Sequence, residues 1–304
     1  MPGYLLKRAL YSFVSLAGLL VLVFFLVRMT GDPGNLYLPL DATQEARAEF
    51  SARNGFDDPV YVQFGRYVGD LVRGDLGDSI RQQRPAIDIV MEAIPVTLWL
   101  AAMAMLLALG GAIVVGALAA YRPGSVFDRF ASVSSLVGAS APDFWVAITA
   151  IIVFSISLQW LPTSGLGGPV TWIMPVCVLV IRPFGLLVQV VRSSMLTVFS
   201  SAYIKTARAK GVKERAVIFV HALRNAMIPV ITVAGDQAAG IANGAVIVET
   251  IFGWPGIGKT MIDAIMQRDF AVVQAAILVT AVVILCINII VDVVYAMLDP
   301  RIRP

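Results

Sequence analysis

Long apolar stretches separated by short polar segments dominate the pattern of residues along this 304-residue chain. A helix that crosses a lipid bilayer needs about 20 consecutive, mostly apolar residues. Six stretches meet or approach that length: residues 9–29, 96–121, 130–158, 172–191, 226–248 and 271–297. The pattern therefore predicts an all-α integral membrane protein with six transmembrane helices.

The composition supports a membrane protein over a soluble one. Hydrophobic residues make up 58% of the chain and charged residues only 14%, whereas soluble domains average about 25% charged residues. The two cysteines, Cys177 and Cys286, each lie in an apolar stretch without neighbouring metal-ligand residues. We expect both to be buried small hydrophobic residues, with neither a disulfide nor a metal site.

The distribution of lysine and arginine predicts which loops face the cytoplasm, because these residues are retained on that side. The basic loops alternate along the chain with an uncharged loop and an acidic segment, residues 31–95, which has eleven acids and six arginines, a net charge of −5. The basic sites are Lys7, Arg8, Arg122, Arg129, residues 192–224, Arg301 and Arg303. Both termini are therefore predicted to be cytoplasmic. The domains expected are a first transmembrane helix (1–30), an extracytoplasmic segment (31–95) and a five-helix core (96–304).

The extracytoplasmic segment is predicted to form short helices divided at Asn54-Gly55, Asp58-Pro59 and Gly74-Asp75. One of these helices, residues 59–72, places its apolar residues on a single face. They are Val60, Phe64, Tyr67, Val68 and Leu71. We expect this helix to lie across the outer ends of the transmembrane helices.

The most basic part of the chain is the loop 192–224, which contains seven lysines and arginines and one acid, Glu214. Because the loop must lie in water, it marks the cytoplasmic side. Ser200 and Ser201 are predicted to cap a short helix that Gly211 ends. Such a helix has too little apolar surface to fold alone, so we expect it to dock on a partner.

Arg182 and Asp236 are ionisable residues that lie well inside predicted transmembrane helices. A charge at the bilayer centre costs at least about 2.5 to 3.5 kcal/mol, so both should face the bundle interior or water. One hypothesis is that they neutralise each other. The other is that they line a substrate path, where Arg182 would hold a carboxylate and Asp236 an ammonium group. Gln237 and Asn243 are further candidates for this path.

Residues 253–260 match the phosphate-loop pattern G-x-x-x-x-G-K-[ST]. Three features oppose nucleotide binding: the segment is predicted to lie outside, no strand supplies a magnesium ligand, and no room remains for a nucleotide-binding domain. We interpret the pattern as a tight outer turn that leads into the sixth transmembrane helix. No catalytic constellation is present either, since the chain has one histidine and no G-x-S-x-G sequence.

Short motifs along nearly the whole chain resemble those of one transporter family. They are residues 31–33 (GDP), 58–63 (DPVYVQ), 74–77 (GDLG), 161–163 (LPT), 192–196 (RSSML), 203–211 (YIKTARAKG), 222–225 (ALRN), 248–249 (VE), 254–258 (WPGIG), 268–269 (RD) and 299–301 (DPR). Together, in this order, they are similar to permease subunits of the dipeptide, oligopeptide, glutathione and nickel group of ABC importers.

The resemblance implies a type I ABC importer permease fold in the bacterial inner membrane. It also implies that the loop 192–224 docks on an ATPase through a coupling helix, whose residues here are Tyr203, Thr206, Ala207, Arg208, Ala209, Lys210 and Gly211. In ABC importers this loop resembles E-A-A-x-x-x-G followed by I-x-L-P. Gly211 matches, but Lys205, Thr206 and Ala207 occupy the first three positions, and Leu223 and Arg224 stand where L-P is expected.

The implied assembly has a second homologous permease, two ATPases and an extracytoplasmic solute-binding protein, within membrane lipid and without nucleic acid. This chain would carry no catalytic site and no cofactor, since ATP and magnesium would bind to the ATPases. It would form the path for peptides. An ion-coupled secondary transporter, a membrane scaffold, and a glutathione or nickel-chelate importer are the alternatives.

Overall fold

The structure is a computed structural model that describes the backbone of residues 2–29, 38, 42–53 and 55–298. Within these helices, the side chains of residues 2–10, 12, 13, 27–29, 47, 242, 243, 292 and 294–298 are not described. The predicted cytoplasmic C-terminus, residues 299–304, lies outside the described residues.

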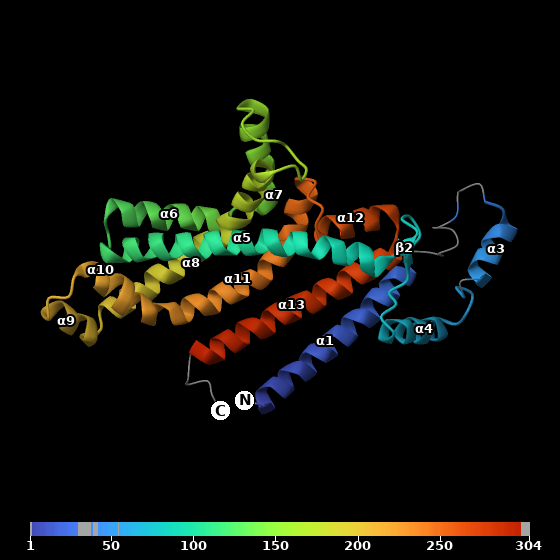
Figure 1. The fold of residues 1–304 in the computed structure, drawn as a ribbon, viewed down its shortest axis with the longest axis horizontal. Coiled ribbons are helices and arrows are strands. Elements are labelled where there is room, and N and C mark those ends of the chain that lie inside the picture. The colour runs from blue at the N-terminus through green and yellow to red at the C-terminus, as the bar shows by residue number, and fades with distance from the viewer. Residues whose placement is uncertain (1, 30–37, 39–41, 54, 299–304) are drawn as a thin grey trace. The chain divides into compact units, whose positions relative to one another are not determined.

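The described chain is helical apart from one two-stranded hairpin, so the predicted all-α class is confirmed (Figure 1). The α-helices are α1 (Pro2–Met29), α3 (Gln44–Arg53), α4 (Val60–Val72), α5 (Ala86–Tyr121), α6 (Val126–Ser140), α7 (Asp143–Ala150), α8 (Pro169–Phe199), α9 (Ala202–Ala209), α10 (Glu214–Ala216), α11 (Leu223–Ile251), α12 (Ile257–Gln267) and α13 (Phe270–Leu298). Two π-helices are η1 (Ile151–Ser157) and η2 (Val217–Ala222), and the strands are β1 (Asp78–Ser79) and β2 (Arg84–Pro85).

Four helical stretches of the described chain are long and apolar enough to cross a membrane, and the bent pair α6 with α7–η1 would make a fifth. A shorter apolar stretch, Val14–Leu26, lies within α1. The chain is therefore a multi-pass membrane protein, while the count of six remains a prediction.

The second transmembrane helix begins earlier than predicted, at Ala86 instead of residue 96, and it contains Pro95. The extension is stabilised as a helix by burial of its apolar side, since Ala86, Ile89, Val90 and Ala93 are all buried. Their spacing of three and four residues places them on one helix face. The polar residues between them concealed this helix from a count of consecutive apolar residues.

The third predicted transmembrane helix, 130–158, is not continuous. It breaks between α6 and α7, which are bent by 102° relative to one another, and Figure 1 shows α7 turning away from α6. Pro142 is the N-cap residue of α7 and cannot donate a backbone hydrogen bond to α6. Ala141, directly before it, has φ −73° and ψ 129°, the extended conformation that a residue preceding proline favours.

The chain forms two compact units, Met1–Pro95 with Lys259–Leu285, and Val96–Gly258 with Cys286–Pro304. The second unit is built on α8, which packs against α6 and α11. Small residues of α5 allow this helix to pack closely against α8. Ala112 and Ala120 are buried, and a side chain at Gly116 would lie 2.7 Å from Val191 of α8. The spacing of four residues in α5 thus forms a packing face.

The first unit contains the predicted amphipathic helix as α4. Phe24 of α1 contacts the rings of Phe64 and Tyr67 at centroid distances of 5.2 and 5.4 Å, and burial raises the pKa of Tyr67 to about 12. The hairpin of β1 and β2 was not predicted. It is attached to the turn before α13, because buried Ser79 donates a hydrogen bond to Asp269 Oδ2 at 2.5 Å.

Candidate functional site

Helix α9, in the basic loop, ends at Gly211 in a left-handed cap. Gly211 has φ +77°, and its N–H donates to the Arg208 carbonyl at 2.9 Å while the Val212 N–H donates to the Ala207 carbonyl at 3.2 Å. These two bonds form a Schellman motif, which requires a left-handed residue that glycine adopts without a Cβ penalty. The predicted helix end at Gly211 is confirmed.

The predicted serine caps of this helix are wrong. Ser201 occupies the N-cap position of α9, but its side chain makes no cap hydrogen bond. Its hydroxyl donates back to the Val198 carbonyl at 2.6 Å, and that of Ser200 donates to the Thr197 carbonyl at 2.7 Å. Since α8 ends immediately before these residues, the hydroxyls satisfy carbonyls of its last turn, which lack helical partners.

Three contacts attach α9 to the segments around it. Ile204 is fully buried in the same core cluster as residues of η2. Tyr203 Oη accepts a hydrogen bond from the Asn225 amide at 2.6 Å. The Arg208 guanidinium donates to both carboxylate oxygens of Glu214, at 2.9 and 3.3 Å. A displacement of α9 would therefore also move η2 and the first turn of α11.

The outward side of α9 is exposed and basic, and we call it the α9 face. Of the predicted coupling residues, Ala207 is half-buried and the others are exposed: Tyr203, Thr206, Arg208, Ala209, Lys210 and Gly211. Further exposed cations lie in the same basic loop: Lys205, Lys213, Arg215 and Arg224. A surface of this charge suits a partner groove lined by acids.

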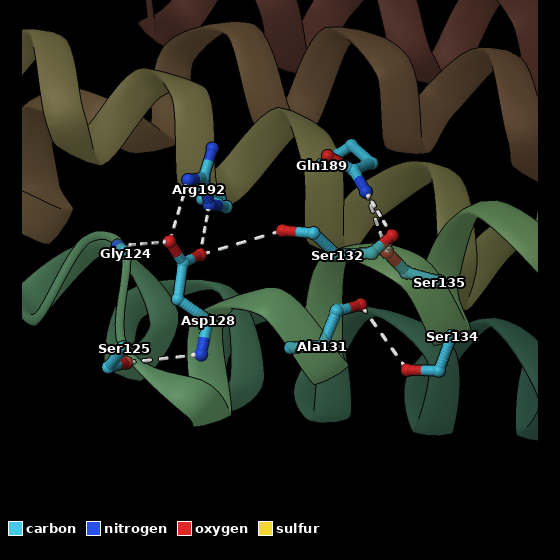
Figure 2. Close-up of polar contacts among 9 residues, drawn as sticks. All are labelled: Gly124, Ser125, Asp128, Ala131, Ser132, Ser134, Ser135, Gln189 and Arg192. Atoms are coloured by element: carbon cyan, nitrogen blue, oxygen red, sulfur yellow. Dashed lines mark hydrogen bonds and ion pairs between the residues drawn. The ribbon is translucent and has the colours of Figure 1, made fainter.

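A bidentate ion pair joins the start of α6 to α8 near the basic loop (Figure 2). Arg192 donates through Nε to Asp128 Oδ1 and through Nη2 to Oδ2 at 2.9 Å. Asp128 also accepts from the Gly124 N–H at 2.8 Å, and its own N–H donates to the Ser125 hydroxyl at 3.2 Å. The carboxylate is only 3% exposed, so its burial is offset by charge-assisted hydrogen bonds.

The same side of α8 continues as a polar seam toward the other end of α6. The Gln189 amide donates to the Ser132 carbonyl at 2.9 Å and to Ser135 Oγ at 2.7 Å (Figure 2). One turn further, Gly185 lies so close to α6 that an added Cβ would collide with the Ser135 carbonyl and approach the Ala139 N at 2.8 Å. We call the whole contact between α6 and α8, from the Asp128–Arg192 pair through Gln189 to Gly185, the α6–α8 seam.

The substrate-path candidates lie on two helices, α8 and α11. Arg182 of α8 and Asp236 of α11 are exposed, and Gln237 is half-buried. Asp236 accepts a hydrogen bond from the Gln237 amide at 3.4 Å. The side chain of Asn243 lies outside the described residues. Among the described side chains, Arg182 forms no ion pair with Asp236, contrary to the neutralisation hypothesis.

A different acid, Asp143, lies within electrostatic range of Arg182, on α7, which packs against α8. Asp143 lies in the first turn of α7, directly after the break at Pro142. It lies beside α11 as well, because an added Cβ at Gly244 would be 3.1 Å from its Oδ2. The sequence held one signal for it, an acid within a predicted transmembrane helix beside a proline.

The phosphate-loop pattern forms a closed turn around a buried carboxylate. Glu249 is fully buried and accepts from the Gly258 N–H at 2.8 Å and from the Thr97 hydroxyl at 2.5 Å. Thr97 Oγ1 accepts from the Ile257 N–H at 2.9 Å. Amide groups that a phosphate would require are thus already bonded within the chain. The turn leads into α12, not directly into the last transmembrane helix as predicted.

The predicted burial of the cysteines is wrong, since both Cys177 and Cys286 are exposed free thiols. Cys177 faces an apolar pocket of about 380 Å³ between α8 and the bent α7–η1 segment. The sequence showed only that these positions are apolar, and lipid-facing residues are apolar too. Among the residues that the structure describes, no three His, Cys, Asp or Glu side chains are grouped to hold a metal.

Residues 112–304 match the profile of the family described as "binding-protein-dependent transport system inner membrane component". The oligopeptide transport system permease protein AppB of Bacillus subtilis (strain 168) is 38% identical over the whole of both chains. The dipeptide transport system permease protein DppB of Alkalihalophilus pseudofirmus is 35% identical, again over both whole chains. The glutathione transport system permease protein GsiC of Salmonella paratyphi A is 36% identical over all of this chain and 99% of its own.

A solved structure of an amino acid ABC transporter with histidines has the same fold over part of the chain. The TM-score is 0.54 at 15% identity, and the match covers 69% of this chain and 94% of the other. At this identity the likeness concerns the fold alone.

Proposed function

Because the chain belongs to the family of binding-protein-dependent transport system inner membrane components, we propose that it is the permease subunit of an ATP-driven peptide importer. In this proposal it provides the path across the bacterial inner membrane and a lever that ATPase subunits move. The observation that carries the proposal is the α9 face, an exposed basic helix anchored through Ile204 to the core.

The α9 face fits a docking role because it combines accessibility with a rigid attachment. Its outward residues are exposed, while the bonds of Tyr203 to Asn225 and of Arg208 to Glu214 connect it to neighbouring segments. When ATP draws two ATPases together, a docked α9 would shift with them and pull on the start of α11. The result is a population shift between inward-open and outward-open states of the bundle.

The proposed assembly contains a second homologous permease, two ATPases and an extracytoplasmic solute-binding protein. ATP and magnesium bind the ATPases in this scheme, and the chain itself has no catalytic role. The turn around Glu249 supports that division, since its amides bond within the chain. The relatives are named for oligopeptide, dipeptide and glutathione transport, so a short peptide with free termini is the cargo class we propose.

The test is uptake of a labelled dipeptide by the complex in proteoliposomes, measured together with ATP hydrolysis. Replacing Gly211 with Leu places a side chain on the α9 face and strains its left-handed cap. We expect uptake per ATP hydrolysed to fall about tenfold or more, a loss of coupling free energy of at least about 1.4 kcal/mol, while membrane insertion is unchanged.

Gly124→Leu is the matched control. Gly124 has φ +78°, close to the +77° of Gly211, and an added Cβ meets no atom within 4 Å at either glycine. Both variants therefore carry a similar backbone strain of about 1–2 kcal/mol, but only one lies on the α9 face. Equal uptake per ATP in the two variants would contradict the docking role. Uptake without nucleotide, driven by an ion gradient, would favour a secondary transporter instead.

A further inference from the structure

An acid and an arginine lie at each end of the α6–α8 seam. The two charges form an ion pair at only one end, which we call the closed end. At the closed end Asp128 and Arg192 form a bidentate pair. Arg182, Gly185, Gln189 and Arg192 follow each other at intervals of three and four residues, which places them on one face of α8. Arg182 thus extends the same stripe to the α6–α7 break, where Asp143 begins α7.

At the open end the two charges attract but do not bond. Asp143 is half-buried and Arg182 is exposed, and their charges interact. Among the described residues, neither side chain makes a hydrogen bond or an ion pair. Both ends have the same two charged groups, so chemistry does not explain the difference. The two ends differ in their backbone: Asp128 lies within α6, whereas Asp143 follows the break at Pro142, after which the chain is bent by 102°.

An unpaired arginine is energetically unfavourable at this position unless water or a bound ligand solvates its charge. Arg182 lies near the middle of α8, a candidate transmembrane helix of 31 residues. A guanidinium at that depth costs at least about 2.5 to 3.5 kcal/mol unless water or an opposite charge solvates it. The missing side chain at Gly244 allows the Asp143 carboxylate to approach α11, since an added Cβ would lie 3.1 Å from its Oδ2. The site therefore presents a cation and an anion whose hydrogen-bonding groups are unused among the described residues.

We infer that Arg182 and Asp143 form a binding site for the two charged termini of a zwitterionic cargo during its passage. Arg182 has the planar donor pattern that binds a carboxylate through two hydrogen bonds. The Asp143 carboxylate accepts from the cargo ammonium group. A zwitterion neutralises both charges at once, whereas a simple anion or cation would leave one of them unpaired. This inference rests on the proposed function and assigns Asp143, in place of Asp236, as the ammonium contact.

The test compares three probes in the assembled transporter in proteoliposomes: dialanine, its C-terminal amide and its N-acetyl form. Every variant receives the same binding protein, so the protein's own preference cancels when uptake ratios are compared between variants. In Arg182→Gln we expect the ratio of dialanine to amide uptake to fall about 10- to 100-fold, the loss for a hydrogen bond to a charged group. In Asp143→Asn we expect the ratio of dialanine to N-acetyl uptake to fall similarly.

Two further variants separate binding from structure. Arg182→Lys keeps the charge but loses the planar two-bond pattern, so the ratio should fall less than in Arg182→Gln; an equal fall would show that the charge does not contribute. Asp128→Asn alters the closed end and should leave both ratios unchanged, even where less transporter assembles. Asp143→Asn tests its half of the site independently, should Arg182→Gln fail to fold.

Unchanged ratios in Arg182→Gln and Asp143→Asn, with ATP-dependent uptake intact, would overturn this site and leave the proposed function standing. A shift of the ratios in Asp128→Asn equal to theirs would also overturn it, because the effect would then be structural. If the unaltered complex shows no ATP-dependent uptake of dialanine, the proposed function itself fails, and this site with it.

Discussion

Replacing Asp128 with Ala should destabilise the α6–α8 seam more than any exposed charge change. The substitution removes the acceptor of two guanidinium hydrogen bonds and of the Gly124 N–H. It also leaves Arg192, whose side chain is only 26% exposed, without its carboxylate. The remaining positive charge then lies partly buried and unpaired.

The magnitude follows from the burial of each partner. Breaking a fully buried ion pair by removing one partner costs about 3–5 kcal/mol. Because Arg192 keeps about a quarter of its surface, water partly solvates it after the change, and we expect about 2–4 kcal/mol. Asp128→Asn retains the shape and an acceptor for Gly124, so it should cost about 1–2 kcal/mol.

The assay is reversible denaturant unfolding of the chain in detergent micelles, run as a double-mutant cycle with Arg192→Leu. We expect the two single changes to be non-additive by about 2 kcal/mol, because each removes the same contact. The control is Glu214→Ala, which breaks the ion pair with Arg208 in the same unit. Those side chains are 42% and 39% exposed, and exposed pairs contribute at most about 1 kcal/mol. Additive effects of Asp128→Ala and Arg192→Leu within about 0.5 kcal/mol would refute the reasoning.

Two other buried contacts give predictions of the same kind. Thr97→Val removes the hydroxyl that donates to Glu249 and accepts from the Ile257 N–H, so we expect the free energy of unfolding to fall by about 2–4 kcal/mol. The control Thr232→Val, at an exposed hydroxyl bonded within its own helix, should change the free energy of unfolding by less than about 0.5 kcal/mol. Equal effects of the two changes would argue against a stabilising role of the buried hydroxyl. Ser79→Ala removes the hydrogen bond to buried Asp269. We expect amide hydrogen exchange in residues 78–86 to accelerate by about 10-fold or more, equivalent to about 1.4 kcal/mol or more of local stability. An unchanged exchange rate would show that this bond does not stabilise the hairpin.

Several features of the fold followed from the sequence because they depend on neighbouring residues. The helix end at Gly211 required only a glycine after a short helical run, and φ at that position is +77°. The apolar face of α4 followed from residue spacing alone. The start of α5 at Ala86 did not follow from the sequence. Its apolar residues recur at intervals of three and four, and the acids Asp88 and Glu92 lie between them in the sequence.

The candidate sites were harder to predict because their partners are distant in sequence. Arg182 stands out in the sequence as an unusual charge, but the sequence does not show that the acid within its electrostatic range is Asp143. Glu249 was seen only as part of a motif, while the structure places it against Thr97 from another helix. Each pairing depends on which helix faces meet, and short-range patterns contain no information about that choice.

The sequence by itself determined that this chain enters a membrane, which segments are apolar enough to cross it, and which loop is basic. Transfer of residues into lipid is close to a sum over local segments, so composition along the chain is sufficient. Only the tertiary structure decided that one arginine of the α6–α8 seam is paired and the other open. Asp128 lies within α6 and bonds to Arg192, whereas Asp143 follows the 102° bend at the α6–α7 break. Which carboxylate meets which guanidinium depends on the packing of helices distant in sequence, and local composition does not contain that information.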